Sequence, residues 1–303
     1  MDHPQTPPSH YAIAEEPPPA DTSFVKRKFL DQAYASISPA QRLDIYLPEQ
    51  GRAPFPLIVA IHGGAFMGCD KADLQVLPML AGLKRGYAVA SINYRLSGEA
   101  KFPALVQDAK AAVRWLRANT ARFGFDPQRV AAWGGSAGGY LATMLGVSAG
   151  VAELEDPGLG NADQPCDVQA AVSWYGPTDF LTMDAFLAES GLLAPEGFRH
   201  SEADSPESRL LGAQITTVPE KVRAANPETY VRPGAPPFLL QHGTADAVVP
   251  VQDSIRLADK LVSAGGPGSV TLELLAGAAH ADPRFETPEN VHKVLAFLDA
   301  HLK

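Results

Sequence analysis

Ala131-Ala132-Trp133-Gly134-Gly135-Ser136-Ala137-Gly138-Gly139-Tyr140 is the stretch that decides the fold of this chain. The apolar run 130–133 predicts a buried strand, and residues 140–147 predict a helix directly after the glycines. Between them stands a G-x-S-x-G pentapeptide, and strand, tight turn, serine and helix together describe a nucleophile elbow. The pentapeptide alone is weak evidence, because roughly one chance match is expected in several chains of this length.

Two other glycine-loop functions are excluded by the same residues. A phosphate-binding P-loop needs a Lys-Ser/Thr pair after its glycines, and none follows here. A dinucleotide-binding G-x-G-x-x-G would need glycine at the position of Ser136. A tight turn with a purely structural role stays open as the alternative, so the serine has to be judged by its partners elsewhere in the chain.

Composition favours a single large α/β domain, or one domain with an insertion. The chain has 303 residues, of which 46% are hydrophobic and 19% charged. Its net charge is −9 and it has no run rich in lysine or arginine, which argues against nucleic acid or an anionic membrane as a partner. No apolar run approaches the roughly 20 residues that span a bilayer.

Cysteine content and the start of the chain both bear on whether the protein is cytoplasmic or secreted. Cys69 and Cys166 are too few for a disulfide scaffold and are not spaced as in a metal knuckle. Residues 1–9 have neither the basic nor the apolar region of a secretion signal. We expect a cytoplasmic protein with reduced thiols; a secretion signal trimmed before residue 1 is the alternative.

The order of apolar segments predicts an α/β fold with a central, mostly parallel eight-stranded sheet and helices on both faces. The first two segments alternate like a hairpin, and the later ones are continuously apolar like buried parallel strands. The expected strands are 29–35, 42–47, 56–61, 87–92, 130–133, 168–174, 238–241 and 270–275. The expected helices are 72–85, 102–122, 140–147, 254–262 and 291–302.

Two proline-containing segments fall outside this alternation of strands and helices. Residues 1–23 predict a proline-rich N-terminal arm that precedes the main domain, 24–303. Residues from about 177 to 236 separate two expected strands, and a connection of that length is usually functional. We expect a helical cap inserted at the carboxyl edge of the sheet, where open α/β sheets bind their ligands.

A catalytic serine requires a histidine base and an acid that orients the histidine. Asp246 follows the expected strand 238–241, and His280 follows the expected strand 270–275. Both positions lie at the carboxyl edge of the sheet, as does Ser136. We therefore predict Ser136 as nucleophile, Asp246 as acid and His280 as base. The alternatives to the acid are Asp179, Asp253 and Asp282.

The tetrahedral oxyanion of such a reaction needs backbone N–H donors. His62-Gly63-Gly64-Ala65-Phe66 follows the first expected parallel strand, and its two glycines let the backbone turn N–H groups toward a ligand. We predict Gly63, Gly64 and Ala137 as the donors. An ordinary turn is the alternative for the glycine pair.

Several motifs are similar to those of hormone-sensitive-lipase-like esterases of the α/β-hydrolase superfamily, and closest to those of bacterial bifunctional acetylxylan/feruloyl esterases. The resemblance covers residues 26–302 and rests on 43–48, 62–65, 93–97, 134–139, 175–180, 242–246 and His280. It implies an α/β-hydrolase fold, serine carboxylesterase activity through an acyl-serine, and the triad and oxyanion loop named above. It also implies homodimerisation through the last strand and the terminal helix. We expect no metal and no organic cofactor.

The resemblance has two departures, and the substrate is less defined than the chemistry. Ala65 stands where many relatives have a third glycine, and Cys69 stands where glycine would be easier. We expect Phe66, Phe180 and Phe186 to line a pocket for a small-molecule ester with a short acyl chain. Aryl esters and acetylated or feruloylated carbohydrates are further candidates. A peptidase or amidase with the same triad, and a catalytically silent ligand-binding protein, are the alternatives.

Overall fold

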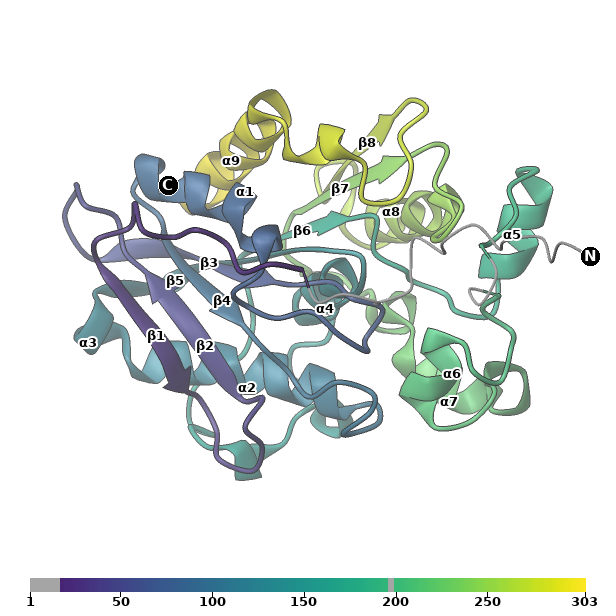
Figure 1. The fold of residues 1–303 in the computed structure, drawn as a ribbon, viewed down its shortest axis with the longest axis horizontal. Coiled ribbons are helices and arrows are strands. Elements are labelled where there is room, and N and C mark those ends of the chain that lie inside the picture. The colour runs from purple at the N-terminus through teal and green to yellow at the C-terminus, as the bar shows by residue number, and fades with distance from the viewer. Residues whose placement is uncertain (1–16, 196–198) are drawn as a thin grey trace, which may run out of the picture.

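A computed structural model describes residues 17–195 and 199–303 (Figure 1). Most of the expected N-terminal arm, residues 1–16, lies outside the described residues. The described end of the arm packs on the loop after the third strand: Pro19 forms an isolated antiparallel bridge with Asp73, and the N–H of Ala20 donates to the carbonyl of Ala72 at 2.7 Å. This end of the arm therefore borders the loop that begins with Gly63.

The sheet has eight strands, as expected. They are β1(Lys28–Ala33), β2(Arg42–Tyr46), β3(Phe55–Ile61), β4(Ala88–Ile92), β5(Phe125–Gly135), β6(Ala170–Trp174), β7(Phe238–Gly243) and β8(Val270–Leu275), in the spatial order β1-β2-β4-β3-β5-β6-β7-β8. The pairs β1–β2 and β2–β4 are antiparallel, and all later pairs are parallel. The predicted mostly parallel sheet is confirmed.

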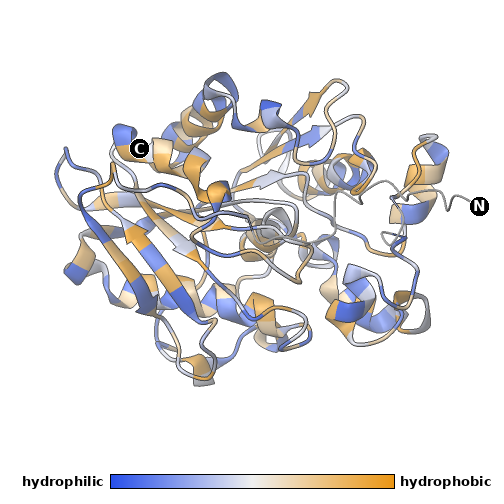
Figure 2. Cartoon of the chain, viewed as in Figure 1, coloured by the Kyte–Doolittle hydropathy of each residue, from blue (hydrophilic) through white to orange (hydrophobic). Residues whose placement is uncertain are grey.

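Side-chain alternation along β3 divides the core between the two faces of the sheet. Leu57, Val59 and Ile61 pack with α2(Ala104–Ala118) and α4(Ala137–Val147), whereas Ile58 and Ala60 pack with α1(Leu77–Leu80) and α9(Pro288–Leu302). The helix α8(Val251–Gly265) covers β7 on the α4 side. Figure 2 shows the apolar central strands between helices of mixed polarity. Each fully buried aliphatic side chain contributes about 1.5–3 kcal/mol.

Two expected helices are interrupted. The expected helix 72–85 consists of η1(Leu74–Val76), α1 and η2(Ala81–Arg85), in which Asp73 caps the first turn and Gly86 ends the last with φ 78°. The expected helix 102–122 is divided into α2 and α3(Thr120–Phe123) at Asn119, whose side chain donates to the carbonyl of Trp115 at 2.8 Å. Local side-chain bonds to the backbone compete with the helix at such residues.

Residues 177–236, which we call the cap segment, contain short helices. These are α5(Met183–Glu189), α6(Pro206–Leu211), η5(Ile215–Thr217), α7(Pro219–Ala225) and η6(Pro227–Tyr230). In Figure 1, α5, α6 and α7 lie at the end of the molecule opposite β1. Phe180, Met183 and Leu210 of this segment belong to the core cluster that includes α2 and α4, so the cap segment packs on the sheet's own core.

Three further 3-10 turns complete the described secondary structure. They are η3(Ala152–Leu154), η4(Pro157–Leu159) and η7(Pro283–Glu286). In the described ranges, no helix combines the length and apolar character that crossing a membrane requires.

Candidate active site

Ser136 occupies the sharp turn between β5 and α4. Its backbone has φ 55° and ψ −123°, a conformation that L-residues rarely adopt and that is typical of a nucleophile elbow. The N–H of Ser136 donates to the carbonyl of Trp174, and the carbonyl of Ser136 accepts from the N–H of Tyr140, both at 2.9 Å. A Cβ on Gly138 would come within 2.0 Å of the carbonyl oxygen of Ile61, so the close helix–strand packing requires glycine there.

The structure brings Ser136, His280 and Asp246 into one chain of contacts. Nε2 of His280 lies 3.0 Å from Oγ of Ser136, and Nδ1 of His280 lies 2.7 Å from Oδ2 of Asp246. Burial lowers the pKa of His280 to about 3, so the imidazole is neutral at pH 7. With its proton on Nδ1 toward the carboxylate, Nε2 presents a lone pair to the serine hydroxyl, as a general base must.

Asp246 is held by its own loop and by a second histidine. Its Oδ1 accepts the N–H groups of Val248 and Val249, each at 2.9 Å. Nε2 of His242 lies 3.2 Å from Oδ2 of Asp246 and 2.9 Å from the carbonyl oxygen of Val249, while Nδ1 lies 2.7 Å from Oγ of Ser254. His242 was not expected at the site; a histidine at the end of β7, four residues before the aspartate, was the available indication.

The three alternative acids are engaged elsewhere. Asp179 pairs with Arg256 at 3.2 Å. Asp253 is fully buried and its Oδ2 accepts the N–H of Thr178 at 2.7 Å. Asp282 caps η7 and pairs with Arg284 at 2.8 Å. These contacts leave Asp246 as the carboxylate placed for His280.

In the expected oxyanion loop, one of the three expected donors is engaged by another residue. The N–H of Gly63 donates to Oε1 of Gln75 at 2.8 Å, so Gly63 does not offer a free donor in this conformation. Gly64, Ala65 and Phe66 follow with φ of 107°, 51° and 64°. Among the described residues, the N–H groups of Gly64, Ala65 and Ala137 donate to no acceptor. Gln75 of η1 makes this contact with Gly63, and the loop sequence does not encode it.

The buried His62 holds the loop 63–66 in place through its ring and its backbone. The ring of His62 stacks on Tyr94 with centroids 4.5 Å apart, and Nδ1 of His62 lies 2.8 Å from the carbonyl oxygen of Gly63. The hydroxyl of Tyr94 donates to the carbonyl of His62 at 2.9 Å. Burial lowers the pKa of His62, so the ring acts here as a neutral structural group. Backbone and side chain of His62 are therefore both tied down next to the serine.

The expected pocket residues are only partly brought together. Phe66 and Phe180 are buried and form an aromatic cluster with Tyr140, with ring centroids 5.4 Å and 5.7 Å from the tyrosine. Phe186 lies apart from them, half-buried beneath the guanidinium of Arg256 at 5.5 Å. An unexpected ring also lies at the site: Tyr175 packs edge-on against His280, with centroids 4.7 Å apart.

Comparisons with known proteins agree on the family to which the chain belongs. The family model described as BD-FAE matches residues 43–261. The chain is similar to the Mycobacterium tuberculosis esterases LipQ (32% identical, 75% of this chain and 50% of the relative) and LipC (30% identical, 86% and 62%). It spans between half and 62% of the length of these two relatives.

Solved structures of similar fold are esterases as well. A truncated carbohydrate esterase from gut microbiota superposes with a TM-score of 0.82 at 30% identity, covering 93% of this chain and 98% of the other. A thermophilic esterase from the planctomycete Thermogutta terrifontis gives a TM-score of 0.66 at 26% identity, with 89% of each chain covered. The sheet and the helices around it are thus those of α/β-hydrolase esterases.

Proposed function

Since the chain belongs to the BD-FAE family, we propose that it is a serine carboxylesterase with Ser136 as nucleophile, His280 as base and Asp246 as acid. The observation that carries the proposal is the continuous contact from Oγ of Ser136 through both ring nitrogens of His280 to Asp246, at 3.0 Å and 2.7 Å. The esterase names of its relatives support the same reaction class.

In the first half-reaction, Oγ of Ser136 attacks the ester carbonyl carbon while its proton passes to Nε2 of His280. Asp246 keeps the other ring proton on Nδ1 and stabilises the imidazolium. Collapse of the tetrahedral intermediate breaks the carbon–oxygen bond of the ester, and the imidazolium protonates the leaving alkoxide. In the second half-reaction, His280 takes a proton from water, whose oxygen attacks the acyl-serine and releases the acid.

The oxyanion is proposed to bind the N–H groups of Gly64, Ala65 and Ala137. Ala137 directly follows the serine, and Gly64 and Ala65 follow Gly63. A Cβ on Gly63 would lie 3.3 Å from Cβ of Ser136. None of the three N–H groups has another acceptor among the described residues. The N–H of Gly63 instead anchors the loop to Gln75. Losing one oxyanion donor typically costs about 2.7–4 kcal/mol of barrier, so the conformation of residues 63–66 governs the rate.

The proposed domain organisation assigns substrate selection to the cap segment. Residues 24–303 would form one hydrolase domain, with residues 177–236 covering the serine. We propose Phe66 and Phe180, which pack against Tyr140, as the apolar wall of a small acyl site. We therefore favour esters with short acyl groups. Acetylated or feruloylated carbohydrates are candidate substrates, in keeping with the carbohydrate esterase among the structural neighbours.

Homodimerisation through β8 and α9 also stays a proposal. β8 is an edge strand of the sheet, and Leu274 on it is 44% exposed. An exposed edge of this kind can pair with a second copy. Sedimentation equilibrium over a range of concentrations tests the proposal, and a single monomeric mass at the highest concentration would exclude it.

The proposed activity is tested by a panel of esters run beside Ser136→Ala. We expect p-nitrophenyl acetate and butyrate to be hydrolysed faster than the C12 ester, and the Ser136→Ala protein to lose at least about 10³-fold in kcat. Acetylated xylooligosaccharides and methyl ferulate test the natural class. A peptide p-nitroanilide in the same panel tests amidase activity. Ester hydrolysis at wild-type rate by Ser136→Ala would refute the proposal.

A further inference from the structure

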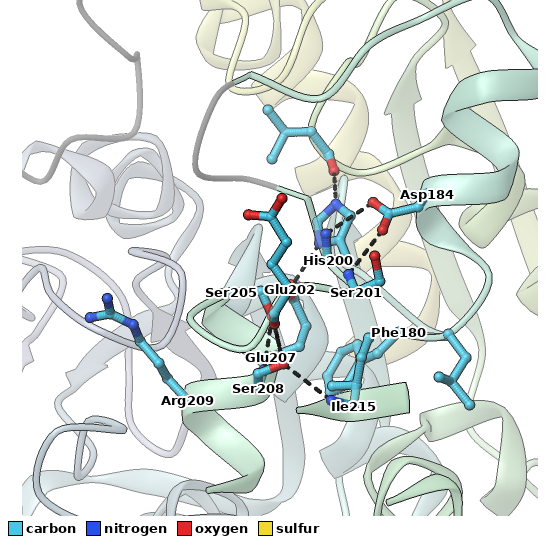
Figure 3. A network of polar contacts seen from close by, with 12 residues as sticks. Phe180, Asp184, His200, Ser201, Glu202, Ser205, Glu207, Ser208, Arg209 and Ile215 are labelled. Carbon is cyan, nitrogen blue, oxygen red and sulfur yellow. Dashed lines mark hydrogen bonds and ion pairs between the residues drawn. The ribbon is translucent and has the colours of Figure 1, made fainter. Parts of the chain in front are cut away.

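A buried ion pair in the cap segment joins His200 and Glu207 (Figure 3). His200 is 2% exposed and Glu207, in the first turn of α6, is 4% exposed. Nδ1 of His200 lies 3.0 Å from Oε2 of Glu207, and Nε2 of His200 lies 2.8 Å from the carbonyl oxygen of Val248. One ring therefore bridges the cap segment and the loop 246–249.

The contacts of His200 indicate its protonation state. A neutral imidazole has one N–H and one lone pair, so it would turn a lone pair toward either the carboxylate or the carbonyl. The charged groups facing the residue are Glu207 of α6 and Asp184 of α5, whose Oδ1 accepts the backbone N–H of His200 at 2.9 Å. Burial lowers the pKa of His200, but these carboxylates outweigh it and raise the pKa to about 9. The ring is thus an imidazolium at neutral pH.

Val248 connects this imidazolium to the aspartate. Its carbonyl faces His200, and its N–H donates to Oδ1 of Asp246 at 2.9 Å. The next carbonyl, that of Val249, faces His242 at 2.9 Å. Two histidines thus hold successive carbonyls of the loop 246–249, His242 from β7 and His200 from the cap segment. Only the second contact depends on where the cap segment lies.

We propose that His200 is a positioning residue, through which the docked cap segment holds the Asp246 loop in the geometry that orients His280. The proposal rests on the proposed function, because it concerns the orientation of the same triad. The competing explanation is an ion pair that only stabilises the cap segment. Such a pair would affect the melting temperature but neither kcat nor its pH dependence.

The double variant His200→Leu/Glu207→Met tests the role without leaving a buried charge unpaired. Exchanging both partners of a buried pair for apolar residues is often neutral for stability, whereas removing one partner is strongly destabilising. We expect kcat for p-nitrophenyl acetate to fall about tenfold, equivalent to about 1.4 kcal/mol, with KM unchanged. As a control, Lys110→Met/Glu155→Gln removes a pair 3.5 Å apart that lies outside the cap segment and the loop 246–249, with Lys110 fully buried and Glu155 partly exposed, and it should leave kcat unchanged.

The single variant Glu207→Gln gives a second, conservative test. The wild-type kcat should fall as pH rises through about 9, because the proton then remains on Nδ1 toward Glu207 and the bond to Val248 is lost. In Glu207→Gln no carboxylate faces Nδ1, so a neutral ring keeps its proton on Nε2, toward the carbonyl of Val248. Glu207→Gln should therefore retain kcat at pH 7 and show no decline between about pH 8 and 10. An unchanged alkaline decline in this variant overturns the proposal.

Active-site titration separates this proposal from the proposed function. A p-nitrophenyl phosphonate should release one equivalent of p-nitrophenol from the wild-type protein and none from Ser136→Ala. No stoichiometric release from the wild type would refute the serine mechanism itself. The His200→Leu/Glu207→Met protein should still titrate fully, about tenfold more slowly. Titration of that protein at the wild-type rate would refute the positioning role alone.

Discussion

Replacing Asp246 by asparagine should disable the base while leaving the fold in place. Oδ1 of Asp246 accepts two backbone N–H groups at 2.9 Å, from Val248 and Val249, so the amide oxygen of asparagine must occupy that position. The amide nitrogen is then forced to the position of Oδ2, 2.7 Å from Nδ1 of His280. A donor there requires a lone pair on Nδ1, which moves the ring proton to Nε2, opposite the serine hydroxyl.

The size of the effect follows from this tautomer. A histidine that carries its proton on Nε2 cannot accept the proton of Ser136, and the comparable substitution in serine proteases lowers kcat about 10⁴-fold. At about 1.36 kcal/mol for each tenfold, that is about 5–6 kcal/mol of transition-state stabilisation. The amide nitrogen would also face the Nε2–H of His242, 3.2 Å from the same oxygen, which adds a donor–donor contact.

The assay is steady-state hydrolysis of p-nitrophenyl acetate, with the melting temperature measured on the same samples. The matched control is Asp253→Asn, a buried carboxylate whose Oδ2 accepts the N–H groups of Thr178 and Asp179. We expect the control to keep kcat within about threefold of wild type, since that residue lies outside the triad. A folded Asp246→Asn protein with kcat within about tenfold of wild type would refute the reasoning.

Three further predictions concern the elbow, the oxyanion loop and pH. Gln75→Leu releases the N–H of Gly63 and should lower kcat about tenfold with little change in KM. Gln75→Glu can still accept that N–H and should lower kcat less. Equal losses of kcat in both variants would argue against anchoring of the loop by Gln75. Ser136→Gly abolishes activity and also relieves the strain of a positive φ. The variant should therefore be more stable than wild type by about 1 kcal/mol, measured as a higher melting temperature. A lower melting temperature than wild type would count against strain at the elbow. Burial lowers the pKa of His280 below its ordinary 6.5; because the base must be unprotonated, kcat/KM should be lost only as pH falls through that lowered value, and an acid limb with its midpoint at 6.5 or above would contradict the stated burial.

The pH dependence of stability should report a different group. Burial raises the pKa of Asp253 to about 7. Between about pH 4 and 7, this carboxyl is therefore protonated in the folded state and ionised in the unfolded state. Stability from this group is complete below the unfolded pKa of 3.8 and is lost as pH rises through about 7. Asp253→Asn should therefore gain in melting temperature relative to wild type more at pH 8 than at pH 4. An equal difference at both pH values would indicate that the residue is charged throughout.

Much of the fold could be predicted because its determinants are local. The alternation and continuous apolar character of the strands, and the spacing of apolar residues in the helices, depend on neighbours in sequence. The positions of Ser136, Asp246 and His280 follow from the same pattern, since each comes shortly after a strand that the pattern locates. The interruption at Asn119 is not evident from the sequence, because a single side-chain contact outweighs an amphipathic period there.

The composition of the site was harder to predict because it depends on contacts between distant segments. The sequence by itself determined the strand–turn–helix around Ser136 and the edge of the sheet at which Asp246 and His280 meet it. Only the tertiary structure decided that Gln75 occupies the N–H of Gly63, that His242 shares the aspartate, and that His200 reaches its loop from the cap segment. Hydrogen-bond partners are chosen by packing in three dimensions, and a one-dimensional pattern locates such groups without showing which of them meet.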